Sequence, residues 1–311
     1  MEMTVKTKND MNDVPDSDDE NIVTAECLSK EFGNFTAVRS IDLRVKEGNI
    51  YGLLGPNGAG KTTTIRMLTT LLTPTTGKIT IAGCKLPAEI AEARRSIGVV
   101  QQQMSLDRDL TVADNIFQHG IQHRMSFKEV RERSKTVAES LGLMPFYKKK
   151  VDDLSGGWKR KTAIACSLVH RPRILFLDEP TAGLDTQSRY MLWDLVRYLR
   201  DTGTTIFITT HYIEEAENLC DRVAIMNKGK VVAEGAPAEL CNQLGEFTVE
   251  YNGNDHKRIY RYFRDKQSAK IFSDTLTDAL SVSVRPICLE DFFLEKTGRI
   301  EFKAGNGDDT I

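Results

Sequence analysis

Short apolar runs alternate with segments of helical periodicity along most of the chain. The runs at residues 50–54 and 174–177 are apolar enough to be buried strands of a parallel sheet. Residues 63–72 and 127–141 instead carry apolar side chains at helical spacing, so we expect helices there. Strands that alternate with helices in this way predict an α/β fold.

These patterns also divide the chain into regions. Strands alternate with one helix over residues 22–102, helices predominate over about 103–170, and the mixed alternation returns over 171–235. A chain of 311 residues suggests about two domains, since single cores stop growing near 250–300 residues. We therefore predict a main domain over residues 21–236, with a helical subdomain at about 103–170.

The two ends of the chain differ in character from this main domain. Residues 1–20 contain seven acidic side chains and only two lysines, a net charge of −5, which predicts a disordered acidic tail. Residues 237–311 show strand-like alternation at Phe247, Val249 and Tyr251 and again at 282–284, with a helix-like span at 265–280. We predict a small α/β accessory domain here.

A glycine-rich motif lies between the first buried strand and the helix that follows it. It fits the phosphate-binding pattern G-x-x-x-x-G-K-[ST], in which backbone N–H groups and a helix N-terminus surround phosphates. Lys61 is expected to reach the β and γ phosphates, and Thr62 a magnesium ion. The residues expected to bind ATP at this loop are Gly55, Pro56, Asn57, Gly58, Ala59, Gly60, Lys61, Thr62 and Thr63.

Two acids follow the apolar run at 174–177. Ligands bind at the carboxyl ends of strands in open α/β sheets, so Asp178 and Glu179 are expected to face the phosphate loop. Asp178 is placed to hold magnesium through its water shell, and Glu179 to act as general base on the attacking water. A charged turn is the alternative, which the upstream phosphate loop makes less attractive.

Between these motifs stands the sequence LSGG, residues 154–157. Ser155 is expected to cap a helix that runs to about His170, and Gly156 and Gly157 leave its first N–H groups open to an anion. LSGG is the signature of the ATP-binding cassette family, and over residues 22–236 this sequence resembles an ATPase subunit of that family. The resemblance implies a P-loop NTPase core with an antiparallel β subdomain and a helical subdomain.

The resemblance also implies roles for residues outside these motifs. Phe32 matches the aromatic residue that stacks on adenine, although a core phenylalanine is an equal alternative on residue type alone. Gln102 matches the glutamine that contacts magnesium and water and senses the membrane partner. The neighbours Gln101 and Gln103 leave a register ambiguity of one, and Gln102 is favoured by its spacing from Ile97 and Gly98.

Asp185 lies in the loop that crosses the dimer interface in this family, and His211 matches the switch histidine that hydrogen-bonds the γ phosphate. The other histidines are read as surface or core residues. One departure is Trp158, which stands where the family usually has glutamine after LSGG. We expect ATP binding between two subunits to survive this change.

Composition agrees with an ATPase that works beside a membrane. Basic and acidic residues number 42 and 44, which gives no general attraction to nucleic acid. The apolar stretches are far shorter than the roughly 20 residues that span a bilayer. The six cysteines show no C-x-x-C pairing, so reduced, buried thiols are expected. A basic middle region, including residues 148–150, is either a solvated helix face or a face near anionic lipid.

The resemblance implies a motor that binds ATP and Mg²⁺, pairs head to tail with a second copy of itself and drives a separate transmembrane permease from the cytoplasmic face of the membrane. The stretches at 210–230 and 288–299 are similar to drug-exporter cassettes of the daunorubicin-resistance type. A soluble cassette ATPase without a transport role is the alternative. A cassette ATPase of DNA repair would have a long coiled-coil arm, and one of translation would have a second phosphate loop. This sequence shows neither.

Overall fold

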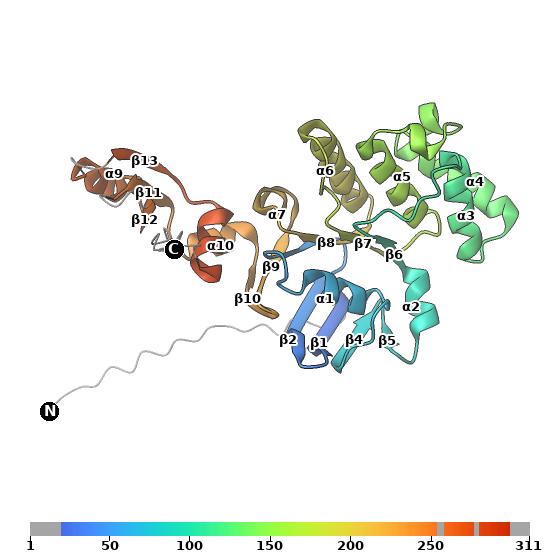
Figure 1. Cartoon of the computed structure of the whole chain (residues 1–311), viewed down its shortest axis with the longest axis horizontal. Helices are drawn as coiled ribbons and strands as arrows, with labels where there is room; N and C mark the ends of the chain where they lie inside the picture. Colours follow the sequence, from blue (N-terminus) through green and yellow to red (C-terminus); the bar gives the residue numbers. More distant parts are fainter. Residues whose placement is uncertain (1–19, 254–257, 277–279, 299–311) are drawn as a thin grey trace, which may run out of the picture.

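The chain is built around three β-sheets, as a computed structural model shows for residues 20–253, 258–276 and 280–298 (Figure 1). The predicted acidic tail lies outside the described residues except for Glu20. The strands are β1 (Asn21–Phe32), β2 (Phe35–Lys46), β3 (Ile50–Leu54), β4 (Thr76–Ile81), β5 (Cys84–Leu86), β6 (Ile97–Val100), β7 (Ile174–Asp178), β8 (Thr205–Thr210), β9 (Arg222–Asn227), β10 (Lys230–Gly235), β11 (Phe247–Asn252), β12 (Arg258–Phe263) and β13 (Leu280–Pro286). The α-helices are α1 (Lys61–Leu68), α2 (Ile90–Ser96), α3 (Val112–Gln122), α4 (Phe127–Ser140), α5 (Gly156–Leu168), α6 (Thr186–Asp201), α7 (Ile213–Leu219), α8 (Pro237–Asn242), α9 (Lys266–Asp274) and α10 (Leu289–Thr297), with short 3-10 turns at η2 (Met144–Phe146) and η3 (Val151–Asp153).

The central sheet has the strand order β10-β9-β3-β8-β7-β6, and its strands are parallel except for β10. Side chains alternate between its two faces. On β7, Leu175 and Leu177 join a core with α5, α6 and α7, whereas Ile174 and Phe176 join a core with α1 and the antiparallel sheet. Because both faces are covered, the strands are apolar runs without polar alternation, which is the pattern the sequence showed.

The antiparallel subdomain is a four-stranded sheet in the order β2-β1-β4-β5. It packs on the α1 side of the central sheet through residues such as Val38 and Leu43 (Figure 1). The α/β fold class and its antiparallel β subdomain are therefore confirmed.

Helices fill the region between β6 and β7, as predicted. The helix expected at 127–141 is α4, which ends one residue earlier. Reciprocal side-chain bonds fix the first turns of α3 and α4, between Thr111 and Asp114 and between Ser126 and Glu129. Helix α5 then leads back into the central sheet.

The C-terminal region adds a three-stranded antiparallel sheet, in the order β12-β11-β13, with α9 packed against it. The helix expected over 265–280 is wrong in length, because α9 ends at Asp274 and Leu280 already belongs to β13. The sheet lies at the opposite end of the molecule from α3 and α4 (Figure 1).

The last described helix, α10, returns to the main domain. Leu289 and Phe292 are fully buried in the same core as the central sheet. The carboxylate of Glu217 on α7 accepts from the Leu289 backbone N–H at 3.0 Å, and Asn227 donates to the Thr297 carbonyl at 3.4 Å. The C-terminal segment is thus attached to the main domain at both ends of α10, and the domain boundary at residue 237 stays a prediction.

The cysteines are free thiols, but only part of the prediction about them holds. Cys166 and Cys220 are buried, and burial raises the pKa of both thiols. Cys27 is exposed, because it lies at an irregularity of β1 where its φ is 49°. Among the described residues, no helix has the length and apolar composition required to cross a membrane.

Candidate nucleotide-binding and catalytic site

The carboxyl ends of four parallel strands meet at one edge of the central sheet. The phosphate loop follows β3, the Gln102 segment follows β6, Glu179 follows β7 and His211 follows β8. These segments border a cavity of about 510 Å³. Its lining includes Asn57, Gly58, Gly60, Lys61, Thr62, Thr63, Gln102, Glu179, Ala182 and His211.

The phosphate loop has a tight backbone path that requires glycine at two positions. At Gly55 a Cβ would overlap the backbone carbonyl of Met226. At Gly60, the residue before α1, φ is 110° and a Cβ would lie 2.7 Å from the Ala37 carbonyl oxygen. The sequence therefore allows the N-terminus of α1 to point at the cavity with its N–H groups unobstructed.

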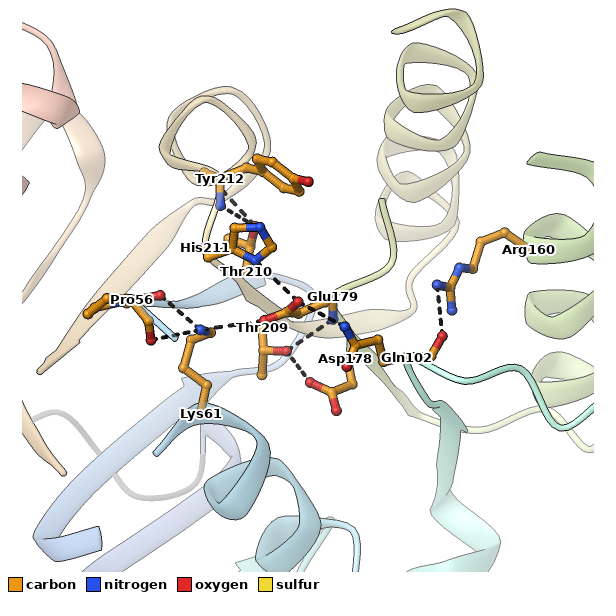
Figure 2. A network of polar contacts seen from close by, with 11 residues as sticks. Pro56, Lys61, Gln102, Arg160, Asp178, Glu179, Thr209, Thr210, His211 and Tyr212 are labelled. Carbon is orange, nitrogen blue, oxygen red and sulfur yellow. Dashed lines mark hydrogen bonds and ion pairs between the residues drawn. The ribbon is translucent and has the colours of Figure 1, made fainter. Parts of the chain in front are cut away.

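Lys61 lies at the floor of this cavity with only 4% of its surface exposed. Its Nζ donates to the carbonyl oxygens of Gly55 at 2.8 Å and Pro56 at 3.2 Å, and it lies 3.5 Å from Oε1 of Glu179 (Figure 2). Burial lowers the pKa of the Lys61 ammonium, and the neighbouring Glu179 charge partly offsets this effect. These partners hold the ammonium of Lys61 at the glycine-rich loop, and its binding of phosphate oxygens stays a prediction.

Asp178 is nearly buried at the end of β7, where it accepts a hydrogen bond of 2.5 Å from the hydroxyl of Thr209. Burial raises the pKa of its carboxyl group, and the Thr209 bond acts in the opposite direction. Asp178, Thr62 and Gln102 border one shared cavity. A carboxylate, a hydroxyl and an amide supply the oxygen ligands that Mg²⁺ prefers, so these residues fit that ion.

Glu179 is the meeting point of the site. Gln102 Nε2 donates to its Oε2 at 3.2 Å, and Nδ1 of His211 lies 3.2 Å from the same oxygen (Figure 2). Its own backbone N–H bonds the Thr209 hydroxyl and carbonyl, and its φ is 45°, an unusual value for a residue with a side chain. The two hydrogen bonds to Thr209 stabilise this unusual backbone conformation. In it, the Glu179 side chain lies toward Lys61, Gln102 and His211.

Ser155 occupies the N-cap position of α5, but the prediction that its side chain caps the helix is wrong. Its hydroxyl makes no capping hydrogen bond and Ser155 is exposed. The signature glycines instead pack beside the loop and helix that follow Glu179. A Cβ on Gly156 would meet Leu184, and one on Gly157 would lie 2.8 Å from the Ser188 hydroxyl.

Asp185 caps α6, because its side chain accepts from the backbone N–H of Ser188 at 2.9 Å. Phe32 is 48% exposed at the end of β1, where Lys30 lies over its ring. Its stacking on adenine stays a prediction. Phe35, across the hairpin, borders the nucleotide cavity and was missed, although it lies only three residues further on.

Trp158 turns away from the nucleotide cavity. Its ring lies 4.4 Å from that of Phe146 between ring centres, and the ammonium of Lys161 lies over it at 4.9 Å. The residue therefore packs within the helical subdomain, and it does not border the cavity beside Lys61.

The phosphate loop, with an acid pair and a histidine at neighbouring strand ends, defines a P-loop ATPase. A family model described as ABC transporter matches residues 38–182. The linearmycin resistance ATP-binding protein of Bacillus subtilis is 40% identical over 228 residues, which cover 73% of this chain and 73% of that protein. The chain belongs to the ABC transporter family and is an ATP-binding ATPase of that family.

Two further comparisons agree with this assignment. The Nod factor export ATP-binding protein I of Burkholderia lata is 40% identical over 294 residues and covers 88% of this chain and 95% of its own length. A solved dimeric ATP-binding cassette, in a post-hydrolysis state bound to ADP and phosphate, has a TM-score of 0.62 and 30% identity. It covers 69% of this chain and 98% of its own.

Proposed function

We propose that this chain is the ATP-hydrolysing motor of an exporter. It binds two ATP molecules between two head-to-tail copies of itself and drives a separate membrane permease from the cytoplasmic face of the membrane. The observation that carries the proposal is the convergence of Lys61, Gln102 and His211 on Glu179 at a phosphate-binding loop.

Hydrolysis follows from the positions of these groups. Lys61 binds the β and γ phosphates, and His211 bonds the γ phosphate. Glu179 accepts a proton from the attacking water. At the same time the water oxygen forms a bond to the γ phosphorus, and the bond between that phosphorus and the leaving oxygen of ADP breaks. Mg²⁺, held by Thr62, Gln102 and the water shell of Asp178, would neutralise phosphate charge.

The residues that line the cavity beside Lys61 support the proposed dimer. Among the described residues, its lining does not include Ser155, Gly156 or Gly157. A second copy rotated by a two-fold axis brings its own signature residues to this side of the ATP, with Asp185 near the shared interface. ATP then joins the two copies, and loss of the γ phosphate lets them separate. The dimeric solved relative supports this arrangement.

The permease contact is supported by a second, apolar cavity beside the Gln102 segment. Met104, Leu106 and Leu71 border it together with Val99 and His119. An amphipathic helix of a membrane subunit that binds here contacts the same loop as Gln102 and so senses opening and closure. The named relatives are linked to linearmycin resistance and Nod factor export, which supports export of drug-like or hydrophobic compounds.

Reconstitution tests the proposal. The chain is co-expressed with a candidate membrane permease, purified from detergent and placed in vesicles whose cassette side faces outward. ATP should drive uptake of a hydrophobic cation, and a Glu179→Gln sample purified in parallel should not. Transport of another solute would correct only the substrate class. Full ATPase activity as a dimer that neither binds nor drives any permease would favour the alternative, a cassette ATPase without a transport role.

A further inference from the structure

Helix α5 is tied to the edge strand β6 by hydrogen bonds from side chains to backbone. The Ser167 hydroxyl donates to the Val99 carbonyl at 2.9 Å. Two turns earlier on the same helix, Arg160 donates to the Gln101 carbonyl at 2.8 Å through Nη1. It also donates to the Gln102 carbonyl at 3.2 Å through Nη2 (Figure 2). Because β6 ends the central sheet, these carbonyls lie at an edge that no further strand covers in the part of the chain that the structure describes.

Arg160 is an unusual choice for such a contact. Only 3% of its surface is exposed, and among the described residues no carboxylate lies within ion-pair distance of it. Burial lowers the pKa of the Arg160 guanidinium, and the more distant charges of Asp178 and Glu215 partly offset this effect. The Nε of Arg160 is buried without a hydrogen-bond partner among the described residues. Burying a guanidinium in this way is costly, so a structural helix contact would be satisfied more simply by a hydroxyl such as that of Ser167. Among the described residues, the hydrogen bonds of Arg160 go to the carbonyls of Gln101 and Gln102 alone, so its directional contacts serve this segment.

The segment that Arg160 contacts is itself bonded to Glu179. The backbone that Arg160 holds belongs to Gln102, and the Gln102 side chain donates to Glu179. Gly156 of the signature precedes Arg160 by four residues, so the two lie on the same face of α5, one turn apart. Helix α5 therefore carries the signature at its N-terminus and, one turn later, the Arg160 side chain that bonds the Gln102 segment.

We propose that Arg160 is a positioning residue that holds Gln102 against Glu179 and so links the signature helix to the catalytic site of its own subunit. The proposal rests on the proposed ATPase dimer, in which the signature touches the ATP of the other copy. Displacement of α5 moves Arg160, and through it Gln102, relative to the general base. Each copy thereby couples the ATP that its signature contacts to the ATP that its own Lys61 binds.

A double-mutant cycle with the full-length protein tests this role. Arg160→Met keeps the unbranched stem of the side chain but removes the guanidinium and its donors, and we expect kcat to fall about tenfold while the KM for ATP stays within about twofold. In a Gln102→Ala background, Arg160→Met should lower kcat by less than about twofold, because Arg160 acts through Gln102. The Mg²⁺ concentration for half-maximal rate should rise in both single variants.

Ser167→Ala is the matched control, because it removes another bond from α5 to a β6 carbonyl. It should leave kcat within about twofold of wild type, and its effect should multiply with that of Gln102→Ala. Arg160→Met effects that also multiply with Gln102→Ala, or an unchanged kcat, would overturn the proposal. Arg160→Lys, which retains the buried charge, goes through the same cycle if the methionine variant does not fold. A wild-type chain without ATPase activity would instead refute the proposed function.

Discussion

The ammonium of Lys61 lies 3.5 Å from the carboxylate of Glu179, so the cation of the phosphate loop and the proposed general base are paired with each other. The pair is nearly buried, with 4% and 10% of the two side chains exposed. Phosphate oxygens and Glu179 therefore compete for Lys61. We expect binding of ATP to draw Lys61 toward the phosphates and to free one carboxylate oxygen of Glu179 for water.

Glu179→Gln should separate binding from chemistry. The amide keeps the size of the side chain but cannot accept the proton of the attacking water, so single-turnover hydrolysis should fall by roughly a hundredfold or more. The affinity for ATP should stay equal or increase, because the charge that competes for Lys61 is gone. Lys61→Ala is the contrasting variant and should weaken ATP binding itself. Wild-type turnover in Glu179→Gln would remove Glu179 from the catalytic role.

The signature is best tested at Gly156. A Cβ on Gly157 meets Ser188 within the same chain, whereas among the described residues one on Gly156 meets only Leu184, at 3.4 Å, an ordinary contact. In a Glu179→Gln background, Gly156→Asp should leave ATP binding by the monomer within about twofold but abolish ATP-dependent dimers, because its carboxylate faces the γ phosphate of the partner's ATP. Light scattering measures the dimer.

Gly156→Asn is the control for this experiment, because it matches aspartate in shape without its charge. It should retain more dimer than Gly156→Asp at the same ATP concentration. Equal dimerisation of the aspartate variant and the parent protein would show that the signature does not contact the second ATP.

Much of the site could be predicted because its groups follow strongly apolar strands. The apolar run before Asp178 and Glu179 predicted a buried strand, and it also predicted the edge of the sheet at which the two acids lie. Thr209 and Arg160 escaped prediction because their roles depend on tertiary pairing. Thr209 meets Asp178 only because β8 lies beside β7 in a particular register, which no local pattern reveals.

Helix capping and strand pairing also limited what could be predicted from the sequence. Ser155 has the residue type and position of a helix cap, yet its hydroxyl makes no capping bond. The span at 265–280 has helical periodicity in a region where tertiary pairing makes Leu280 the start of a strand. Local preference competes with sheet pairing in such segments, and the sequence alone does not show which prevails.

Trp158→Gln restores the residue usual in the family and should cost stability more than nucleotide binding. Trp158 packs on Phe146 and below Lys161, so the exchange loses aromatic contact inside the helical subdomain. We expect the free energy of unfolding to fall by about 1–3 kcal/mol. Urea denaturation measures this, and ATP affinity of the monomer should change less than about twofold. A large loss of ATP affinity would place Trp158 at the nucleotide after all.

Stability below neutral pH should depend on His170, whose ring stacks on that of His123 with 3.6 Å between ring centres. Its Nε2 bonds the Ile97 carbonyl, and its buried Nδ1 has no partner among the described residues. Burial lowers the pKa of His170 to about 4, and His123 adds to the effect. A proton on Nδ1 would have no acceptor there.

The unfolded chain therefore binds more protons than the folded one between pH 6.5 and about 4, since the ordinary pKa of histidine is 6.5. Stability is present above this window and is lost as pH falls through it. For His170 alone the loss between pH 7 and pH 5 amounts to about 2 kcal/mol. His170→Gln, which can still donate to the Ile97 carbonyl, should remove this part of the loss in urea denaturation at the two pH values. Carboxyl groups titrate equally in both proteins, so an identical loss in wild type and variant would show that His170 is not the group responsible.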